Sequence, residues 1–295
     1  MDRSVGIAAS MLLTGTQGLG LDETADGGPQ SIAQSPLGPI DPSDEACDPE
    51  SGFACTVFPG DGRTLRPTTT TFPWRTMVGL YPKDSSGPSR CSGVFIGPRH
   101  VLTAAHCVWD RGAHALMRAD VVPGLDGFGS EPNGVETVKY YVLPEGWDNE
   151  GDIRYDYALL VLWDQELTLG WQGLVAKKHV NLNETTGWTA GYPGSSGSCS
   201  ASPEGSGLCW DYLYAQSCTL QQVWASEIWH KCDAQKGQSG SAHYHYNGGN
   251  RQVVGVLAAE SSNWTKDSRI RSGNFDSLCD WIGDYATDGH SHDCY

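Results

Sequence analysis

Three short segments of this sequence carry residues that could together perform nucleophilic catalysis. Ser239 lies in the sequence Gly-Gln-Ser-Gly, His106 follows an apolar segment, and Asp156 comes just before the apolar run 158–162. A serine hydroxyl is a weak nucleophile until an imidazole accepts its proton, and a carboxylate must hold the imidazole tautomer and stabilise its charged form. We therefore expect Ser239 as the nucleophile, His106 as the general base and Asp156 as the orienting carboxylate.

Gly237, two residues before this serine, adds a fourth part. A residue without a side chain can turn its backbone N–H, together with that of Ser239, toward the oxyanion of a tetrahedral intermediate. Asp148 and Asp152 also lie near the carboxylate position. We prefer Asp156 because only it directly abuts the apolar strand that would bury it beside the histidine, and we expect the other two to be surface turn residues.

The elements that must position these residues are short strands. Apolar runs bounded by glycine and proline recur from residue 75 onward, a rhythm typical of antiparallel barrels. The expected strands lie at 77–81, 94–96, 101–105, 137–143, 158–162, 188–191, 220–228, 241–246 and 252–258. The segment 275–285 has its apolar residues on one helical face, which predicts a C-terminal helix. The sequence thus predicts an all-β fold with the candidate residues in loops at strand ends.

The composition limits the possible partners and the compartment. The net charge of −16 opposes nucleic acid and anionic membranes as partners, because a polyanion would be repelled. Ten cysteines without a Cys-x-x-Cys pair indicate an oxidising compartment, and hence a secreted protein. The expected chemistry requires no cofactor. No acidic loop matches a recognisable calcium site, and a stabilising calcium ion stays an open alternative.

Residues 1–59 are expected to be a leader. A moderately apolar run at 5–13 follows Arg3 and resembles a weak signal segment, with the ordinary start of a longer precursor as the alternative. The part from 21 to 59 is rich in glycine, proline, aspartate and serine without periodicity, which indicates a propeptide. Residues 286–295 are expected to be a loose tail.

The neighbours of the three candidate residues resemble those of a known family. The order histidine, aspartate, serine is that of the chymotrypsin-like serine proteases, and the segments 91–96 and 101–107 resemble the family's first-barrel hairpin. The segments 61–74, 187–194 and 232–241 resemble the V8-like, glutamyl-endopeptidase-like branch. The resemblance covers about residues 60–285.

This resemblance implies a fold, a set of partners and a disulfide. The fold would be a double antiparallel β-barrel over about 60–170 and 171–275, followed by the helix. The implied function is a serine endopeptidase acting on protein or peptide substrates, and we expect a monomer. The family also implies a disulfide between Cys91 and Cys107. For the other cysteines we assume pairing between sequence neighbours: Cys47 with Cys55, Cys199 with Cys209, Cys218 with Cys232, and Cys279 with Cys294.

The sequence departs from the trypsin type around the nucleophile. Trypsin-type chains have Gly-Asp-Ser-Gly-Gly-Pro, whereas Gln238, Ser241 and Ala242 stand at three of those positions here. The Ile-Val-Gly-Gly start, whose freed amine pairs with that aspartate, is also missing from the resembling region. We therefore do not expect activation by that ion pair, and we predict a maturation cleavage between Arg63 and Thr64.

Candidate residues of the substrate pocket leave the specificity open. Asp233, six residues before the serine, stands where trypsin-like enzymes recognise basic side chains, although a structural hydrogen-bonding role is an equal alternative. Leu257 stands where glutamyl endopeptidases carry a pocket histidine, which weakens the case for acidic specificity. Ala258 and Ala259 would leave the pocket walls open, and Glu260 could reach substrate or point to solvent.

Other interpretations of the sequence concern metal binding and a different function. His243 and His245 alternate along a predicted strand, but two such residues without a third ligand are usually solvated, so we expect no metal site there. His290, His292 and Cys294 belong to the expected tail. As an alternative function, a protease homologue could have kept the fold as a catalytically inactive binding module. An esterase with the same residues is disfavoured, because the α/β-hydrolase order is serine, aspartate, histidine.

Overall fold

The computed structural model describes residues 31–32, 62–83, 91–127, 129–164, 168–193, 211–247, 249–260 and 264–285. Almost all of the expected leader, the tail and the cysteines Cys47, Cys55, Cys199, Cys209 and Cys294 lie outside these residues. The segment Ser31–Ile32 within the expected leader forms the short strand β1, which pairs with β11 (Gly173–Val175).

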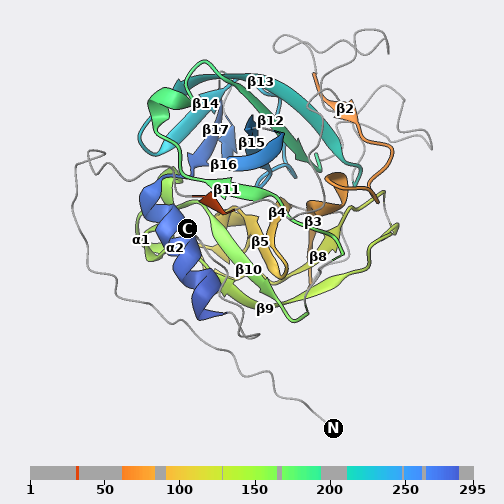
Figure 1. Ribbon diagram of the computed structural model, residues 1–295. Helices are drawn as coiled ribbons and strands as arrows, with labels where there is room; N and C mark the ends of the chain where they lie inside the picture. The colour runs from red at the N-terminus through yellow and green to blue at the C-terminus, as the bar shows by residue number, and fades with distance from the viewer. Residues whose placement is uncertain are drawn as a thin grey trace.

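The first barrel is a closed ring of six antiparallel strands (Figure 1). Its strands follow one another around the ring in the order β10, β5, β4, β3, β8 and β9. In chain order they are β3 (Met77–Pro82), β4 (Cys91–Gly97), β5 (His100–Thr103), β8 (Ala119–Pro123), β9 (Glu136–Val142) and β10 (Ala158–Leu162). The strands β4 and β10 are buried along their whole length, because side chains on one face fill the barrel and those on the other contact the rest of the protein.

The second barrel also closes on itself. Its six strands pair in the order β16, β15, β12, β13, β14 and β17, and β17 returns to β16. In chain order they are β12 (Thr186–Gly191), β13 (Tyr214–Val223), β14 (Glu227–His230), β15 (Ala242–Asn247), β16 (Asn250–Glu260) and β17 (Thr265–Arg269). The expectation of an all-β, chymotrypsin-like double barrel is thereby confirmed.

Short elements complete the described structure. Besides β1 and β11 these are β2 (Thr64–Leu65), β6 (Trp109–Asp110), β7 (Ala115–Leu116), α1 (Glu145–Glu150) and the 3-10 turns η3 (Trp74–Thr76), η4 (Ala105–Cys107), η5 (Ile153–Tyr155) and η6 (His179–Asn181). The strand β2 joins the second barrel through β13, with Leu65 opposite Tyr214 and Thr64 opposite Ala215. No helix of the described residues is long and apolar enough to cross a membrane.

The C-terminal helix α2 (Ser272–Asp284) follows the second barrel and returns to the first (Figure 1). Phe275, Leu278, Trp281 and Ile282 are all buried, as their spacing predicts. The Trp281 ring stacks on that of Tyr157, with 5.8 Å between the ring centroids. Because Tyr157 follows Asp156, the helix supports the segment that presents this carboxylate.

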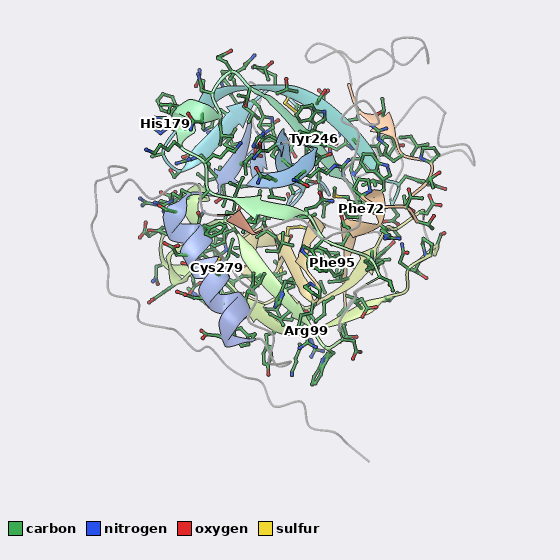
Figure 2. All side chains as sticks on the ribbon, viewed as in Figure 1. Phe72, Phe95, Arg99, His179, Tyr246 and Cys279 are labelled. Atoms are coloured by element: carbon green, nitrogen blue, oxygen red, sulfur yellow. A yellow bond between two sulfur atoms is a disulfide. The ribbon has the colours of Figure 1, made fainter. Side chains whose placement is uncertain are left out.

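Several parts of the strand pattern differ from expectation, and strand β8 was not among the expected strands. The expected strand 220–228 is a hairpin, in which β13 ends at Val223 and β14 begins at Glu227. The turn contains neither glycine nor proline and therefore carries no local turn signal. Strand β17 was not anticipated because it reads Thr-Lys-Asp-Ser-Arg, yet closure of the barrel buries Asp267, Ser268 and Arg269. Figure 2 shows how densely side chains fill both barrels, with Phe95 labelled in the first and Tyr246 in the second.

Candidate active site

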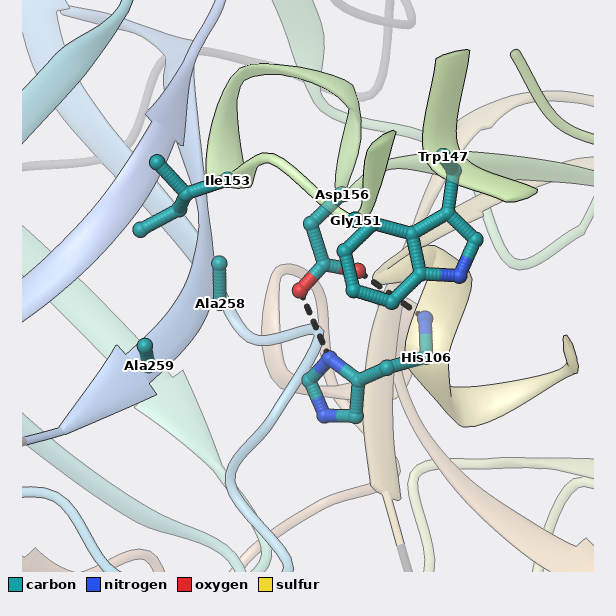
Figure 3. Close-up of a pocket in the computed structure, with 7 residues that line it drawn as sticks. All are labelled: His106, Trp147, Gly151, Ile153, Asp156, Ala258 and Ala259. Atoms are coloured by element: carbon teal, nitrogen blue, oxygen red, sulfur yellow. Dashed lines mark hydrogen bonds and ion pairs between the residues drawn. The ribbon is translucent and has the colours of Figure 1, made fainter. Parts of the chain in front are cut away.

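A cavity of about 240 Å³ opens between the two barrels (Figure 3). His106 and Asp156 line it from the first barrel, and Ala258 and Ala259 line it from β16 of the second. Trp147, Gly151 and Ile153 complete the described lining. The candidate histidine and aspartate therefore face a space that a ligand could enter.

Asp156 holds His106 through both of its carboxylate oxygens. Oδ2 lies 2.7 Å from the ring Nδ1 of His106, and Oδ1 accepts the backbone N–H of the same residue at 2.9 Å (Figure 3). An ionised carboxylate only accepts hydrogen bonds, so the network places the ring hydrogen on Nδ1. Nε2 of the neutral ring is then a proton acceptor, and the described residues provide no hydrogen-bond partner for it.

Local structure fixes both partners. The chain leaves β5 at Thr103 and enters the 3-10 turn η4, which carries His106 and ends at Cys107. A disulfide joins Cys107 to Cys91 at the start of β4. Asp156 lies at the end of η5, where its N–H bonds to the carbonyl of Ile153 at 3.1 Å. Two 3-10 turns, one of them tied down by a disulfide, thus present the two side chains to each other.

The surroundings of His106 move its pKa upward. Burial of the ring lowers the pKa, but the hydrogen bond to Asp156 and the negative charge of that carboxylate raise it by more, so the pKa lies above the ordinary value of 6.5. The His106 side chain is 32% exposed whereas the Asp156 side chain is 4% exposed. The aspartate is therefore shielded from water while the imidazole keeps access to the cavity.

The segment that carries Ser239 is bound to the first barrel through Ser92. The backbone N–H of Ser92 donates to the carbonyl of Ser239 at 2.7 Å, and its hydroxyl donates to the carbonyl of Gly237 at 2.9 Å. The same hydroxyl accepts the N–H of Tyr192 at 2.9 Å. One small residue of β4 thus holds the expected nucleophile loop in register with the first barrel.

Two glycines allow this close approach. Gly237 has φ of 102° and Gly240 has φ of 85°, both in the region that favours glycine. A Cβ on Gly240 would lie 2.2 Å from the carbonyl oxygen of Ser92 and 3.0 Å from the backbone nitrogen of Ala104. Because Ala104 stands two residues before His106, the backbone after Ser239 packs directly against the turn that carries this histidine.

The candidate pocket residues are placed differently from one another. Ala258 and Ala259 line the cavity, whereas the side chain of Leu257 is buried. The backbone carbonyl of Leu257 accepts the N–H of Gly240 at 2.8 Å. One carboxylate oxygen of Asp233 accepts the N–H of Gly62 at 2.8 Å, which favours the structural role of this residue. Glu260 is exposed, one residue beyond the cavity lining.

Asp148 and Asp152, the two other aspartates near the carboxylate position, have partners other than His106. Asp152 accepts the N–H of Arg154 at 2.9 Å and caps η5, and Asp148 accepts the indole N–H of Trp109 at 2.7 Å. Sequence reasoning missed Trp147, whose ring centroid lies 6.4 Å from that of His106, and the bridging role of Ser92. A lone tryptophan in a loop and a lone serine in a strand carry no local signal of such roles.

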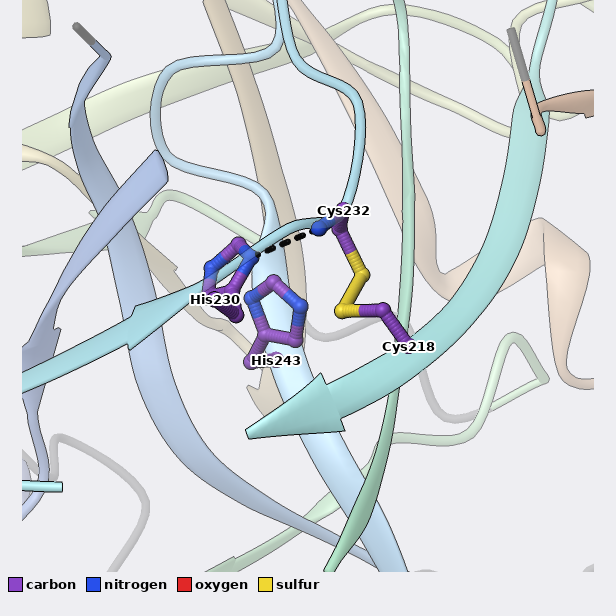
Figure 4. A group of neighbouring side chains, drawn as sticks. All are labelled: Cys218, His230, Cys232 and His243. Carbon is purple, nitrogen blue, oxygen red and sulfur yellow. Dashed lines mark hydrogen bonds between the residues drawn. A yellow bond between two sulfur atoms is a disulfide. The ribbon is translucent and has the colours of Figure 1, made fainter. Parts of the chain in front are cut away.

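Within the part of the chain that the structure describes, two clusters of histidine and cysteine have the geometry of metal ligands, but both contain a disulfide. Cys91 pairs with Cys107, and Cys218 pairs with Cys232 (Figure 4). A disulfide sulfur is not a thiolate ligand, so neither cluster provides its cysteines to a metal ion. Cys279 is also disulfide-bonded, to a partner outside the described residues.

The expectation that His243 is a solvated strand residue is wrong. His243 is fully buried, and its Nδ1 lies 2.9 Å from Oδ2 of Asp267. His245 on the same strand is half-buried.

Comparison with known proteins agrees with this geometry. The sequence model of the trypsin family matches residues 65–282. Glutamyl endopeptidase of Bacillus licheniformis is 28% identical over 236 residues, which cover 77% of this chain and 69% of the relative. A protein named extracellular metalloprotease of Bacillus subtilis is 25% identical over 231 residues, again 77% of this chain and 69% of the relative. A solved structure of a Glu endopeptidase superposes with a TM-score of 0.61 at 24% identity, covering 76% of this chain and 97% of that structure.

Proposed function

This chain belongs to the trypsin family and is a serine endopeptidase of the V8-like branch, and we propose that His106, Asp156 and Ser239 form its catalytic triad. The observation that carries the proposal is the bond between His106 and Asp156 at the cavity between the barrels. It leaves Nε2 as the proton acceptor of a histidine whose tautomer and orientation are fixed. The backbone after Ser239, packed against the histidine turn, supports its assignment as the nucleophile.

The reaction follows from these roles. Ser239 Oγ attacks the scissile carbonyl carbon while His106 Nε2 takes the hydroxyl proton, and the N–H groups of Gly237 and Ser239 donate to the resulting oxyanion. The C–N bond breaks as His106 delivers its proton to the leaving amine, which leaves an acyl-enzyme. Water, deprotonated by His106, then attacks the acyl carbon and releases the acid. Asp156 stays ionised throughout and stabilises the imidazolium.

The substrate is a protein or a peptide, and the site of action is proposed to be extracellular. All described cysteines are disulfide-bonded, which suits an oxidising compartment, and one relative is named as extracellular. The name of the other relative refers to glutamyl bonds. We do not extend that preference to this chain, because an apolar Leu257 stands where that branch carries a histidine.

An inactive homologue would be expected to have lost part of this machinery. All three residue types are present here, and the hydrogen bond that orients the histidine is formed. The binding-module alternative therefore has no supporting observation, and it becomes an outcome of the experiment that follows.

Reaction with a fluorophosphonate tests the proposed nucleophile. Because such reagents phosphonylate an activated serine, we expect a single adduct on Ser239, located by mass spectrometry of proteolytic fragments. The Ser239→Ala variant should take no label, and heat-denatured protein controls for unspecific reaction. Absence of label on the folded, disulfide-bonded protein would refute the triad and make the binding-module alternative the leading one.

A further inference from the structure

The side chain of Arg63 reaches the loop that precedes Ser239. Its Nη1 donates to the side-chain oxygen of Gln238 at 2.5 Å, and its Nη2 donates to that of Gln235 at 2.9 Å. Two nitrogens of one rigid guanidinium thus hold two acceptors that are three residues apart. The contact spans more than 170 residues of sequence, so it ties the entry segment to the proposed active site.

The base of this contact is fixed. Thr64, the next residue, pairs with Ala215 of β13 and donates its hydroxyl to the same residue's carbonyl at 3.0 Å. On the other side, the N–H of Gly62 donates to Asp233 at 2.8 Å. Arg63 is therefore held between two anchored neighbours, and its guanidinium can position the loop rather than follow it.

The acceptors lie inside the turn that presents the oxyanion donors. The side-chain oxygen of Gln238 also accepts the backbone N–H of Gln235 at 3.2 Å, and the backbone N–H of Gln238 donates to the carbonyl of Gln235 at 3.0 Å. Gln238 is 1% exposed. The turn they close contains Gly237 at φ of 102°, whose N–H is one of the two proposed oxyanion donors.

Arg63 contacts Gln238, the position just before the serine at which the chain departs from the trypsin type. There a freed amine pairs with an aspartate just before the serine, whereas here that position is the neutral Gln238. The charge-assisted partner is an arginine within the same chain, already in contact. Hydrogen bonds from a charged donor are stronger than those between neutral groups, so a glutamine is a sufficient acceptor.

We propose that Arg63 is a positioning residue of this protease: through Gln235 and Gln238 it holds the segment Gly237–Ser239 in the conformation that presents both oxyanion donors. The inference rests on the proposed function. Arg63 is not among the residues that line the cavity, and it acts through the loop.

To position the loop, Arg63 must stay in the protease domain during maturation. Cleavage between Arg63 and Thr64, as predicted from the sequence, would separate the guanidinium from the protease domain. The active protein should instead retain Arg63 in the same polypeptide as Ser239. N-terminal sequencing of active protein that begins at Thr64 would overturn the inference.

Kinetics of variants test the positioning role. In Arg63→Gln we expect kcat for a peptide substrate to fall about 10- to 100-fold, less than the loss of a whole oxyanion donor, with KM changed less than about twofold. Arg63→Lys keeps the positive charge but loses the two-pronged guanidinium. Its kcat should therefore lie between that of Arg63→Gln and that of the unaltered protein. Arg66→Gln is the matched control: it removes a charge from the same segment, where Arg66 contacts the ring of Trp74, and its kcat should stay near that of the unaltered protein.

A double-mutant cycle separates positioning from general destabilisation. Because Arg63 and Gln238 form one link, the losses of Arg63→Gln and Gln238→Ala should be strongly non-additive. A kcat for Arg63→Gln within about twofold of the unaltered protein, or equal losses in Arg63→Gln and Arg66→Gln, would overturn the inference. If the unaltered protein itself neither cleaves peptide nor takes the fluorophosphonate label, it is the proposed function that fails.

Discussion

Histidine and aspartate side chains meet both at the cavity and inside the second barrel. At the cavity, Asp156 holds a single imidazole, that of His106, which is 32% exposed. In the second barrel, Asp267 lies between His230 at 3.1 Å and His243 at 2.9 Å, and all three side chains are at most 1% exposed. The same residue types thus occur in two very different environments.

The difference lies in what the second ring nitrogen does. In the buried group, Nδ1 of His230 accepts the N–H of Cys232 at 3.2 Å (Figure 4). Its Nε2 lies 3.1 Å from Oδ1 of Asp267, so both nitrogens are occupied. Burial lowers the pKa of His230 below its ordinary value, with the positive contribution of Asp267 too weak to offset it. His106 has one nitrogen held and one facing the cavity, and its pKa is raised. A histidine becomes available for proton transfer when one nitrogen stays open to substrate, and a carboxylate neighbour alone does not make it so.

Replacing the carboxylate at the cavity should have the largest effect. Asp156→Asn keeps the shape but allows the wrong tautomer of His106, so we expect kcat to fall by about 10⁴-fold with little loss of stability. Peptide hydrolysis and thermal unfolding should be measured on the same preparation. The proposed role of Asp156 would be untenable if the variant kept more than about a tenth of the activity while remaining folded.

Replacing the carboxylate in the barrel should reverse this pattern. Asp267→Ala leaves two buried imidazole groups without their acceptor, and we expect a loss of about 3 kcal/mol in the free energy of unfolding, from 1–3 kcal/mol per unsatisfied group. The kcat of the folded fraction should stay close to that of the unaltered protein. Urea unfolding provides the measurement, and Asp284→Ala, an exposed change at the end of α2, is the control. Equal stability of the two variants would contradict the structural role of Asp267.

The sequence predicts the fold and the cavity group better than the buried group. His106, Asp156 and Ser239 stand in segments whose neighbours are informative: an apolar strand, a cysteine, a glycine turn. Strands with apolar alternation could be found for the same reason. Strand β17 could not, because its polar residues are buried only through pairing with strands that are distant in sequence.

The buried group and Arg63 depend on tertiary contacts that leave no local pattern. His243 of β15 and Asp267 of β17 meet inside the second barrel, and the residue pattern of neither strand shows this contact. Gly255 leaves the space for this group, since a Cβ there would lie 3.1 Å from the Cβ of Asp267. The sequence predicts a maturation cleavage after Arg63, but it carries no sign of the side-chain partners of Arg63, which lie more than 170 residues away.

The smallest expected effect is a difference in pH dependence between the two groups. For activity, His106 must be neutral to accept a proton, and its raised pKa places the acidic limb of kcat/KM above about 6.5. For stability, the relevant pKa is that of His230, which is shifted in the opposite direction, downward. The folded state resists protonation of His230, so below about pH 6.5 the unfolded state binds more protons and the free energy of unfolding falls as pH falls. The pKa of Asp267 is lowered in the folded state, so the free energy of unfolding continues to fall at pH values below the pKa of an ordinary carboxyl group.

Urea unfolding between about pH 5 and 8 checks the expected fall in stability at low pH, and kcat/KM over the same range checks the acidic limb of activity. His230→Asn removes the titrating group, so the stability of this variant should depend less on pH below about 6.5 while the acidic limb of its activity stays in place. If instead the activity limb moved with this variant, the two groups would be coupled, and the division into a cavity histidine and a structural histidine would fail.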